Sequence, residues 1–562
     1  MNIAEMSRWI NIMNNEQLSV DQYKKMSMEK EKIGFKHFDK IKLIFFIACF
    51  ILCFDRGMFQ LRWDSAKNYE FVQVYGWDEW SLFGHVSYSY LLWCRIWKLV
   101  FFNDALLGMI FGNILLYLLS ICCFWRITES LSNETSVIKN ILPVSLFAFS
   151  PWTLGMVHSQ SSDYLMMCFS VFILLSIIKK KWWCFGVLSL FFCFIKEPAI
   201  LAFGGICIGV IIADLIEGQT EGKKFKTIIY EKKWMIMAGI VVIWLAAFLS
   251  ADRGTNSGSS YAGGGFSFDR ENLVEKLKVV FLLNLNWMIW IGIVAGAIGG
   301  IIIGKHKKRE WTKTLVISIC GSALAVMIAF LALYKIYNNA RYFLPAVPFI
   351  LFLFIAVTGS VRQKNMILAT TVLKSVLVLL SLVECFITVD PVSRLAFGET
   401  DIGKASMIST YMYGDGMTYN RQIEWGEIAY QFALTEAVKE GDLIFTPVMY
   451  NAYGFFDGIE EFAPAEPAKY AIRSELYNDS LGIRDAVKNR PGDMRLDFVE
   501  LSDAQALGSF ENDSSYHGRA SLIYNVMAGE DIVSFVKDKY NVVEEKSYSF
   551  RGFEYKRLIF EM

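Results

Sequence analysis

The sequence predicts a polytopic α-helical membrane protein with about eleven transmembrane helices, followed by a soluble α/β domain. Of its 562 residues, 54% are hydrophobic, 15% are aromatic and only 20% are charged, and the mean hydropathy is +0.37. An ordinary soluble domain has about 25% charged residues. The formal net charge is zero, and the basic residues lie in clusters between apolar runs. The expected surrounding is therefore a lipid bilayer, and nothing in the charge indicates a nucleic-acid partner.

Long apolar runs mark the expected spans. A bilayer core about 30 Å thick is crossed by roughly 20 apolar residues in a helix. Eight runs have that character: 105–125, 138–157, 198–216, 234–250, 281–303, 314–334, 345–361 and 366–388. Three shorter runs can also be interpreted as a signal-type segment, a re-entrant hairpin or a buried helix: 41–54, 164–178 and 182–195.

The positions of Lys and Arg favour counting all eleven runs as spans. With eleven crossings, residues 1–40 are cytoplasmic, and so are the basic clusters at 179–181, 223–233 and 305–309. This is the asymmetry that the positive-inside rule requires. No small-residue cleavage site comes after the first run, which we therefore interpret as an uncleaved anchor. Residues 41–388 form the expected transmembrane domain.

The composition changes after Phe386, and an odd number of spans places the C-terminal region outside the cytoplasm. We interpret residues 389–562 as an extracytoplasmic α/β domain. It has strand-like stretches at 442–448 and 521–527, helical stretches near 421–439 and 530–540, and a final strand pair around Gly552. All eleven cysteines of the chain lie in or beside the apolar runs, so this domain has no disulfide framework.

Charged residues gather in the segments expected on the outer side. The first external loop, 55–104, contains an apolar, aromatic stretch at 84–102 that suits a helix lying at the membrane interface. Ionisable groups are costly within the bilayer, so charges of both signs around one mouth of the membrane domain indicate a polar site. The members of this group are Asp64, Asp78, Glu79, His85, Asp163, Lys196, Glu197, Arg341 and Tyr342.

The order of these motifs resembles the GT-C glycosyltransferase superfamily, which includes the protein O-mannosyltransferases and the lipid A aminoarabinose transferases. The resemblance rests on the Asp-Glu pair in "YGWDEW" (75–80), the Asp that closes 150–163, the Lys-Glu turn before Pro198, and "ARYFLPAVP" (340–348). It covers most of 41–361. The resemblance implies a bacterial-type, multi-pass cell-membrane enzyme. Such an enzyme moves a hexose or pentose from a polyprenyl phosphate, outside the cytoplasm, onto a glycan, lipid or protein of the cell envelope.

The resemblance also implies roles for the residues. Asp78 is the expected general base of an inverting transfer, and Glu79 is expected to orient the acceptor or a neighbouring cation. Arg341, Lys196 and His85 are expected to face the donor phosphate, because a leaving phosphate gains negative charge. Asp163, Asp64, Glu197 and Tyr342 are expected to position substrate or partner side chains. Asp64 is a second acid in the same loop, and Asp78 is preferred because it directly precedes the interfacial stretch.

Several alternatives stay open at this point. Asp78 and Glu79 could be a solvated loop pair between interfacial tryptophans, Arg341 a snorkelling anchor, and Lys196-Glu197-Pro198 an ordinary tight turn. No cofactor is firmly predicted. Metal-dependent members of the superfamily exist, but adjacent carboxylates without a histidine at ligand spacing give no positive evidence for a divalent metal. The competing functions are a transporter or flippase for lipid-linked sugars, and a non-catalytic scaffold whose outer domain binds glycan.

Overall fold

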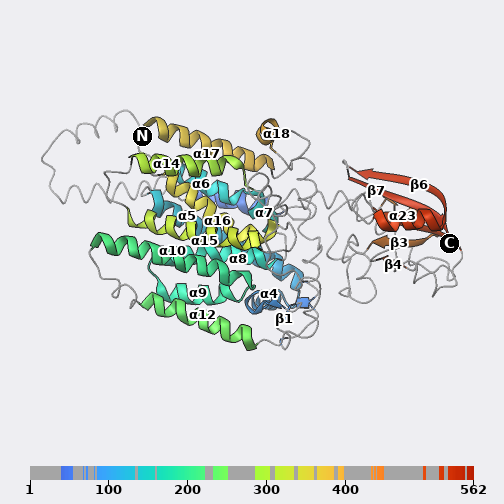
Figure 1. The fold of residues 1–562 in the computed structure, drawn as a ribbon, viewed down its shortest axis with the longest axis horizontal. Coiled ribbons are helices and arrows are strands. Elements are labelled where there is room, and N and C mark those ends of the chain that lie inside the picture. Colours follow the sequence, from blue (N-terminus) through green and yellow to red (C-terminus); the bar gives the residue numbers. More distant parts are fainter. Residues whose placement is uncertain are drawn as a thin grey trace.

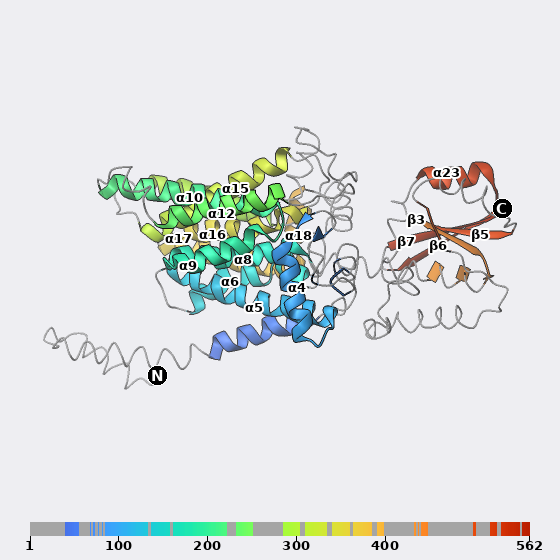
Figure 2. The same cartoon turned by 90° about the horizontal axis from the view of Figure 1, so that it is seen from below.

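A computed structural model describes the chain over the following residues: 40–54, 68, 71–73, 77, 81–82, 85–132, 137–157, 161–221, 232–250, 285–303, 310–333, 340–359, 364–384, 390–397, 432–433, 436–437, 440–447, 498–501, 518–524, 530–550 and 553–562. Up to residue 397 these residues form a helical unit, and the later ones form a sheet with a helix (Figures 1 and 2).

Each of the eleven apolar runs contains a helix. Residues 40–52 are helical, and then come α5 (Ala105–Ser132), α6 (Val137–Ala148), α8 (Ser162–Ile178), α9 (Trp182–Cys193), α10 (Pro198–Glu221), α12 (Lys232–Ser250), α14 (Trp287–Ile303), α15 (Trp311–Leu333), α16 (Val347–Thr358) and α17 (Lys364–Glu384). Within the described ranges, four helical stretches are long and apolar enough to cross a membrane: Ala105–Ser132, Pro198–Gln219, Lys233–Ser250 and Trp311–Phe330. The number of crossings stays a prediction.

Two of the expected spans are not single helices, and prolines explain both. The run 138–157 divides into α6 and the short α7 (Pro151–Val157), because Pro151 has no N–H to continue α6. The run 345–361 is entered through the 3₁₀ helix η5 (Ala340–Ala346), which contains Pro345, and α16 begins only at Val347. Proline also disfavours an α-helical residue before it, so both breaks are explained by the local sequence.

The interfacial stretch 84–102 contains a helix, as expected. α4 (Tyr88–Val100) comes after a two-stranded hairpin of β1 (Ser81–Leu82) and β2 (His85–Val86). α4 packs closely on α5, because Gly108 and Gly112 of α5 leave room for Trp97. A Cβ at Gly108 would lie 2.5 Å from the Trp97 carbonyl oxygen, and one at Gly112 would lie 2.7 Å from the Trp97 ring.

α10 and α15 pack on each other along their lengths through a second glycine pair. A Cβ on Gly205 would lie 2.7 Å from Ala323 Cα, and a Cβ on Gly209 would lie 2.3 Å from Ile319 Cα. These spacings admit no side chain, so the two backbones are in direct contact. Close backbone approach through small residues is the usual packing mode of membrane helices, where apolar area alone gives no preference for one helix face over another.

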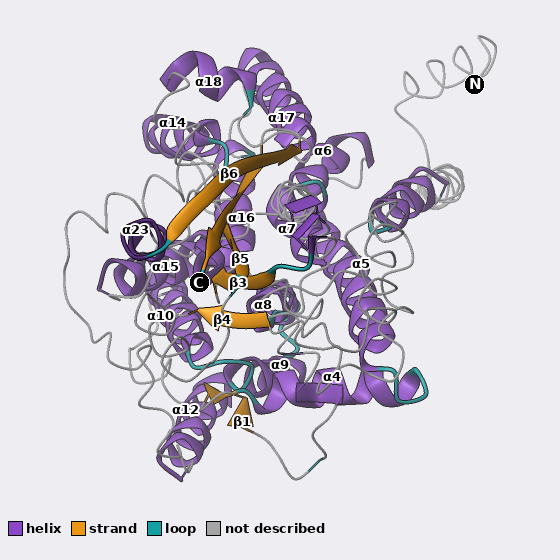
Figure 3. Ribbon diagram, turned by 90° about the vertical axis from the view of Figure 1, so that its right-hand side faces the viewer, coloured by secondary structure: helices purple, strands orange, loops and turns teal. Residues whose placement is uncertain are grey.

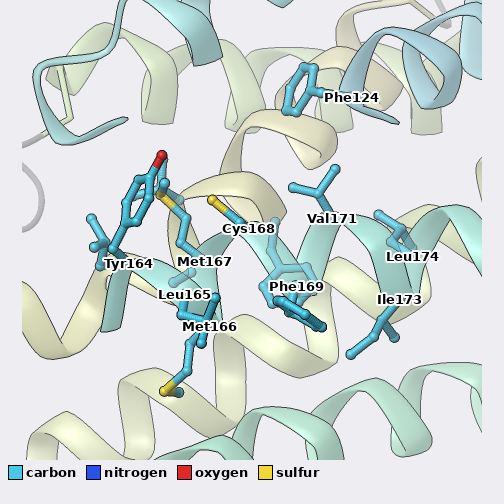
Figure 4. Close-up of a cluster of buried hydrophobic side chains, with 14 of the residues drawn as sticks. Phe124, Tyr164, Leu165, Met166, Met167, Cys168, Phe169, Val171, Ile173 and Leu174 are labelled. Carbon is cyan, nitrogen blue, oxygen red and sulfur yellow. The ribbon is translucent and has the colours of Figure 1, made fainter. Parts of the chain in front are cut away.

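α8 lies at the centre of the helical unit and is apolar on all sides, as a helix surrounded by other helices requires. Tyr164, Met167 and Cys168 are completely buried (Figure 4). Phe124 of α5 stacks between Phe147 of α6 and Phe352 of α16, with ring centroids 4.6 and 4.1 Å apart. The core is therefore shared by helices from both halves of the membrane domain.

The C-terminal part contains a five-stranded sheet. Its members are β3 (Leu443–Pro447), β4 (Phe498–Leu501), β5 (Arg519–Tyr524), β6 (Asn541–Phe550) and β7 (Phe553–Glu561), with α23 (Glu530–Lys539) between β5 and β6 (Figure 3). The strand order is β4-β3-β5-β7-β6. β3 is parallel to β4 and β5, and β7 is antiparallel to β5 and β6. The strands predicted at 442–448 and 521–527 correspond to β3 and β5, and the predicted helix at 530–540 is α23. Most of 421–439 and Gly552 lie outside the described residues.

A charged network lies on one face of this sheet. Arg557 of β7 is fully buried and donates to Asp442 and Glu440, both at 2.6 Å, and to Ser521 Oγ at 2.8 Å. On the more exposed side of the network, Lys546 of β6 donates to Glu436 at 2.5 Å. β6 is an outer strand of the described sheet, and its register shifts between Val542 and Glu544.

A pair of capping residues joins two distant parts of the chain. Asn286 Oδ1 accepts from the Met288 N–H at the start of α14, and its Nδ2 donates to Asp390 Oδ2 at 3.3 Å. Asp390 in turn accepts from the Val392 and Ser393 N–H groups of α18 (Pro391–Phe397). Both residues are buried. Figure 1 shows α18 at the same end of the helical unit as α4 and α7.

Candidate active site

The first turn of α8 carries the buried carboxylate of Asp163. Ser161 is the N-cap of α8, and its Oγ accepts a hydrogen bond from the Asp163 N–H at 3.2 Å. Asp163 therefore lies where the exposed N–H groups of the helix favour a negative charge. Only 2% of the residue is exposed. A carboxylate this deeply buried requires a cation partner.

That partner is Lys196, in the turn between α9 and α10. Its Nζ lies 3.2 Å from both carboxylate oxygens of Asp163, and the two side chains are 14% and 3% exposed. The turn forms because Pro198 begins α10, where its missing N–H breaks no hydrogen bond. Backbone bonds from Ala199 N to Lys196 O and from Ile200 N to Glu197 O continue it into the helix. The two charges predicted separately by the sequence are thus brought together.

α4 covers this ion pair from the side. The Ser89 N–H donates to the Phe194 carbonyl of the same turn at 2.9 Å, and the Tyr88 ring stacks on Phe194 at 5.9 Å. Tyr90 is 3% exposed, and burial raises its pKa well above the usual value, so the phenol stays neutral. Cys94, Asn68 of the first loop and the charge of Asp163 also affect this pKa, after burial, so these groups are neighbours of the phenol.

η5 approaches from a further direction. This 3₁₀ helix packs on α8 and contains Arg341 and Tyr342. The first loop, α4, α8, the α9–α10 turn and η5 therefore converge at one end of the helical unit, which we call the α8-start end. The opposite end is marked by Lys179, which comes directly after α8 and donates to Ser130 of α5, and by the Lys42–Glu129 ion pair at 2.9 Å.

The structure describes some of the site residues predicted from the sequence in full, some by their backbone alone, and some not at all. Asp163, Lys196 and the half-buried Glu197 lie together at the α8-start end. The backbones of His85 in β2 and of Arg341 and Tyr342 in η5 are described, but their side chains are not. Asp64, Asp78 and Glu79 lie outside the described residues, so the assignment of the base stays a prediction.

Sequence reasoning missed three buried polar residues at this end. Asn68 and Tyr90 belong to the hydrogen-bonded group beside Asp163. Asn113 of α5 donates from Nδ2 to the Val157 carbonyl at 3.1 Å, and its own carbonyl accepts from the Tyr164 hydroxyl at 3.4 Å. The signal available for Asn113 was an amide in the middle of an otherwise apolar run, where such groups are costly unless they are paired.

The site offers groups suited to an anionic ligand. A partly exposed lysine beside neutral donors can bind a phosphate through charge-assisted hydrogen bonds. Within the described ranges, no three His, Cys, Asp or Glu side chains come close enough to hold a metal ion. The carboxylates of the first loop lie outside those ranges, so the question of a divalent metal stands as the sequence left it.

Comparison with known proteins gives matches among solved structures. No protein-family model and no curated protein matches the sequence. The crystal structure of ArnT from Cupriavidus metallidurans bound to undecaprenyl phosphate is similar to the chain with a TM-score of 0.47 and 10% sequence identity, over 92% of this chain and 97% of that one. The apo form of ArnT gives a TM-score of 0.46 and 9% identity, over 93% and 98%.

At this identity the likeness concerns the overall fold only. The chemistry is therefore argued from the chain's own residues.

Proposed function

We propose that the protein is a GT-C-type membrane glycosyltransferase that moves a sugar from a polyprenyl-phosphate carrier to an acceptor outside the cytoplasm. The observation that carries this proposal is the buried Asp163–Lys196 pair at the α8-start end, where five separate segments converge. Lys196 lies in a partly exposed turn between two helices, where its ammonium can meet a phosphate as well as the Asp163 carboxylate.

The proposed reaction is a single displacement with inversion. An acceptor hydroxyl oxygen bonds to the anomeric carbon while the bond from that carbon to the phosphate oxygen breaks. Asp78 takes the hydroxyl proton, a contribution typically worth about 10²–10⁴-fold. The phosphate leaves with added negative charge, which the cations Lys196 and Arg341 stabilise, with His85 as a third donor.

Asp163 acts in this scheme through Lys196. Its two oxygens hold the ammonium at 3.2 Å, which fixes where the cation meets the phosphate. Asp163 is therefore a positioning residue. Glu79, Glu197 and Tyr342 orient the acceptor and the neighbouring cations, and Asp64 is the second candidate for the base. The donor sugar, a hexose or pentose, enters from the bilayer, and residues 389–562 help to select the envelope acceptor on the outer side of a bacterial cell membrane.

The test is sugar transfer from a radiolabelled polyprenyl-phosphate donor pool in membranes that contain the wild type or one variant at equal protein level. Asp78→Asn and Lys196→Met should each abolish transfer, and Asp64→Asn should retain it. Asp214→Asn is the matched control. Asp214, in the body of α10, forms a buried pair at 2.7 Å with Lys233 in the first turn of α12, and this control should retain transfer per folded molecule.

Three results would contradict parts of the proposal. If Asp64→Asn alone abolishes transfer, Asp64 is the base and Asp78 is not. If Lys196→Met transfers as well as the wild type, the pair has no role in donor binding. If the wild type transfers no sugar from any supplied donor, a transporter or a glycan-binding scaffold replaces the enzyme, and donor uptake or glycan binding then separates those two.

A further inference from the structure

The C-terminal half of α4 is hydrogen-bonded to two backbone carbonyls of the first loop. Lys98 Nζ donates to the carbonyl oxygens of Val72 at 3.0 Å and Gln73 at 2.9 Å. The Gln73 side chain then accepts from the Ala105 N–H, the first amide of α5, at 3.0 Å. Phe71 and Val72 are buried at this contact. Residues 71–73 are thus fixed to the junction of α4 and α5.

A second contact lies four residues further along the loop. The guanidinium carbon of Arg95 lies 5.7 Å from the centre of the Trp77 ring, within cation–π range. Arg95 is 2% exposed, whereas Trp77 is 46% exposed. The tryptophan therefore covers a buried cation. Trp77 directly precedes Asp78 in the sequence, and consecutive Cα atoms are about 3.8 Å apart, so a fixed Trp77 restricts where the Asp78-Glu79 pair can lie.

The spacing of the two cations is itself informative. Arg95 and Lys98 are three positions apart on one helix, so they lie on the same face. Burial, and then the charge of Arg95, lowers the pKa of Lys98. Two like charges on a partly buried face are unfavourable alone, and the carbonyls and the ring of the loop offset that cost.

α4 is a firm base for such contacts because both of its ends are anchored. The Ser89 N–H is bonded to the turn that carries Lys196, and Trp97 is seated against the two glycines of α5. The helix therefore joins the segment before Asp78 to the turn before α10.

We propose that Arg95 and Lys98 are positioning residues that tether residues 71–73 and Trp77, which precede the proposed base Asp78 in the sequence, to α4. Their role for catalysis rests on the proposed function, but the tether itself does not. Neither residue contacts the donor in this assignment; both act through the loop.

The test measures the tether directly, by hydrogen–deuterium exchange of peptides covering 68–80 in the purified full-length protein without substrate. Hydrogen bonds from a charged donor contribute about 1.5–3 kcal/mol, so Lys98→Met should speed exchange in these peptides by about tenfold or more. Trp77→Leu should act in the same direction. Lys98→Arg keeps a charged donor within reach of both carbonyls and should restore the protection.

Lys42→Met is the matched control, because it also removes a bonded lysine, here the ion-pair partner of Glu129 on α5. Its partner Glu129 lies about 36 Å along α5 from Ala105, by the helical rise. Exchange in 68–80 should be unchanged in this variant. Unchanged exchange in Lys98→Met would overturn the tether, and so would acceleration that spreads equally to α8 and α10, since that marks general unfolding.

Kinetics then separate positioning from donor binding. If wild-type membranes transfer sugar, Lys98→Met should lower kcat and leave the KM for the donor unchanged, and Lys98→Arg should recover kcat. A raised donor KM with unchanged kcat would make Lys98 a donor ligand and overturn its assignment. If the wild type transfers no sugar, the proposed function fails, whereas the exchange result still decides the tether.

Discussion

The two ends of the helical unit each contain a buried lysine–carboxylate pair, and the two pairs differ in where their residues are placed. Asp214 lies in the body of α10 and Lys233 in the first turn of α12, with Nζ 2.7 and 2.8 Å from the two carboxylate oxygens and side chains 5% and 8% exposed. Asp163 and Lys196 lie on a helix start and a turn, at the longer distance of 3.2 Å.

The surroundings of the two lysines also differ. Lys233 lies over the ring of Trp182, 5.5 Å from its centre, in a tightly packed position between helices. Lys196 is more exposed, and Tyr90 and Asn68 lie beside its partner. The difference teaches that burial and pairing alone do not mark a functional site. What separates the two pairs is the place of the cation: Lys196 lies in a partly exposed turn between two helices, whereas Lys233 lies in the first turn of α12 over the Trp182 ring.

The largest effect is expected when the cation of the Asp163–Lys196 pair is removed. Lys196→Met should lower sugar transfer by about 10²–10³-fold, the usual loss when one charge-stabilising donor is removed. The rate per folded molecule is measured after detergent extraction and size exclusion. A variant that loses transfer only because less of it is folded would place Lys196 with Lys233, as a packing residue.

Removing the cation of the other pair should affect stability instead. Lys233→Met leaves Asp214 buried without its partner, a change that typically costs about 3–5 kcal/mol. The double variant Asp214→Leu with Lys233→Met should recover most of that loss, since apolar residues often replace a buried ion pair at little cost. Thermal unfolding of the three proteins checks both statements. Loss of transfer per folded molecule in the double variant would contradict the division of roles.

α10 connects the two pairs, because it begins at Pro198 beside Lys196 and carries Asp214 about 24 Å further along. Gly209→Ala would place a Cβ 2.3 Å from Ile319 Cα of α15 and force the two backbones apart. Overpacking of this kind costs about 1–3 kcal/mol, and the displaced helix should also lower transfer. Gly204→Ala, where a Cβ has no neighbour within 4 Å, is the control in both thermal unfolding and transfer.

The smallest effect is expected on the outer side of the charged network of the sheet, where Glu436 and Lys546 are more exposed than the residues of either pair. Bonds from Lys546 and then Tyr548 lower the pKa of Glu436 from 4.5 to about 2. Because the pKa of Glu436 is lower in the folded protein than in the unfolded chain, its carboxylate stabilises the fold above about pH 4.5. This contribution is lost as pH falls from about 4.5 towards 2. Glu436→Gln should remove this pH-dependent part of the free energy of unfolding, which amounts to about 1 kcal/mol at most. Melting temperatures of both full-length proteins across this pH window test it, and parallel curves would contradict it.

Much of the helical unit could be predicted from the sequence, because lipid demands long apolar helices and positively charged ends. α5 and α10 coincide with their expected runs for this reason. The division at Pro151 was also encoded locally, but hydropathy averages over a proline and so joined α6 to α7. The tight α10–α15 contact needed knowledge of which helices are neighbours, and that is a property of the whole fold.

The candidate site was predictable only in its charged members. Asp163 and Lys196 stood out because charge is rare in such a chain, yet their pairing spans 33 positions and depends on how α8 packs against α9. Tyr90 was hidden among interfacial aromatics, whose usual role is to anchor a helix at the bilayer surface. Arg95 lies in the stretch that the sequence predicts to be an interfacial helix, and only packing shows that Trp77 covers it.

The place of β6 at the outer edge of the described sheet affects how copies of the protein can contact each other in a crowded membrane. An open strand edge can recruit the edge of another copy of the same protein, and this danger grows when many copies share one surface. The exposed Glu544, the neighbouring Lys546 and the register shift after Val542 interrupt this strand. Two copies that meet at β6 therefore present each other with charge and an irregular ladder, which disfavours pairing of the two strands.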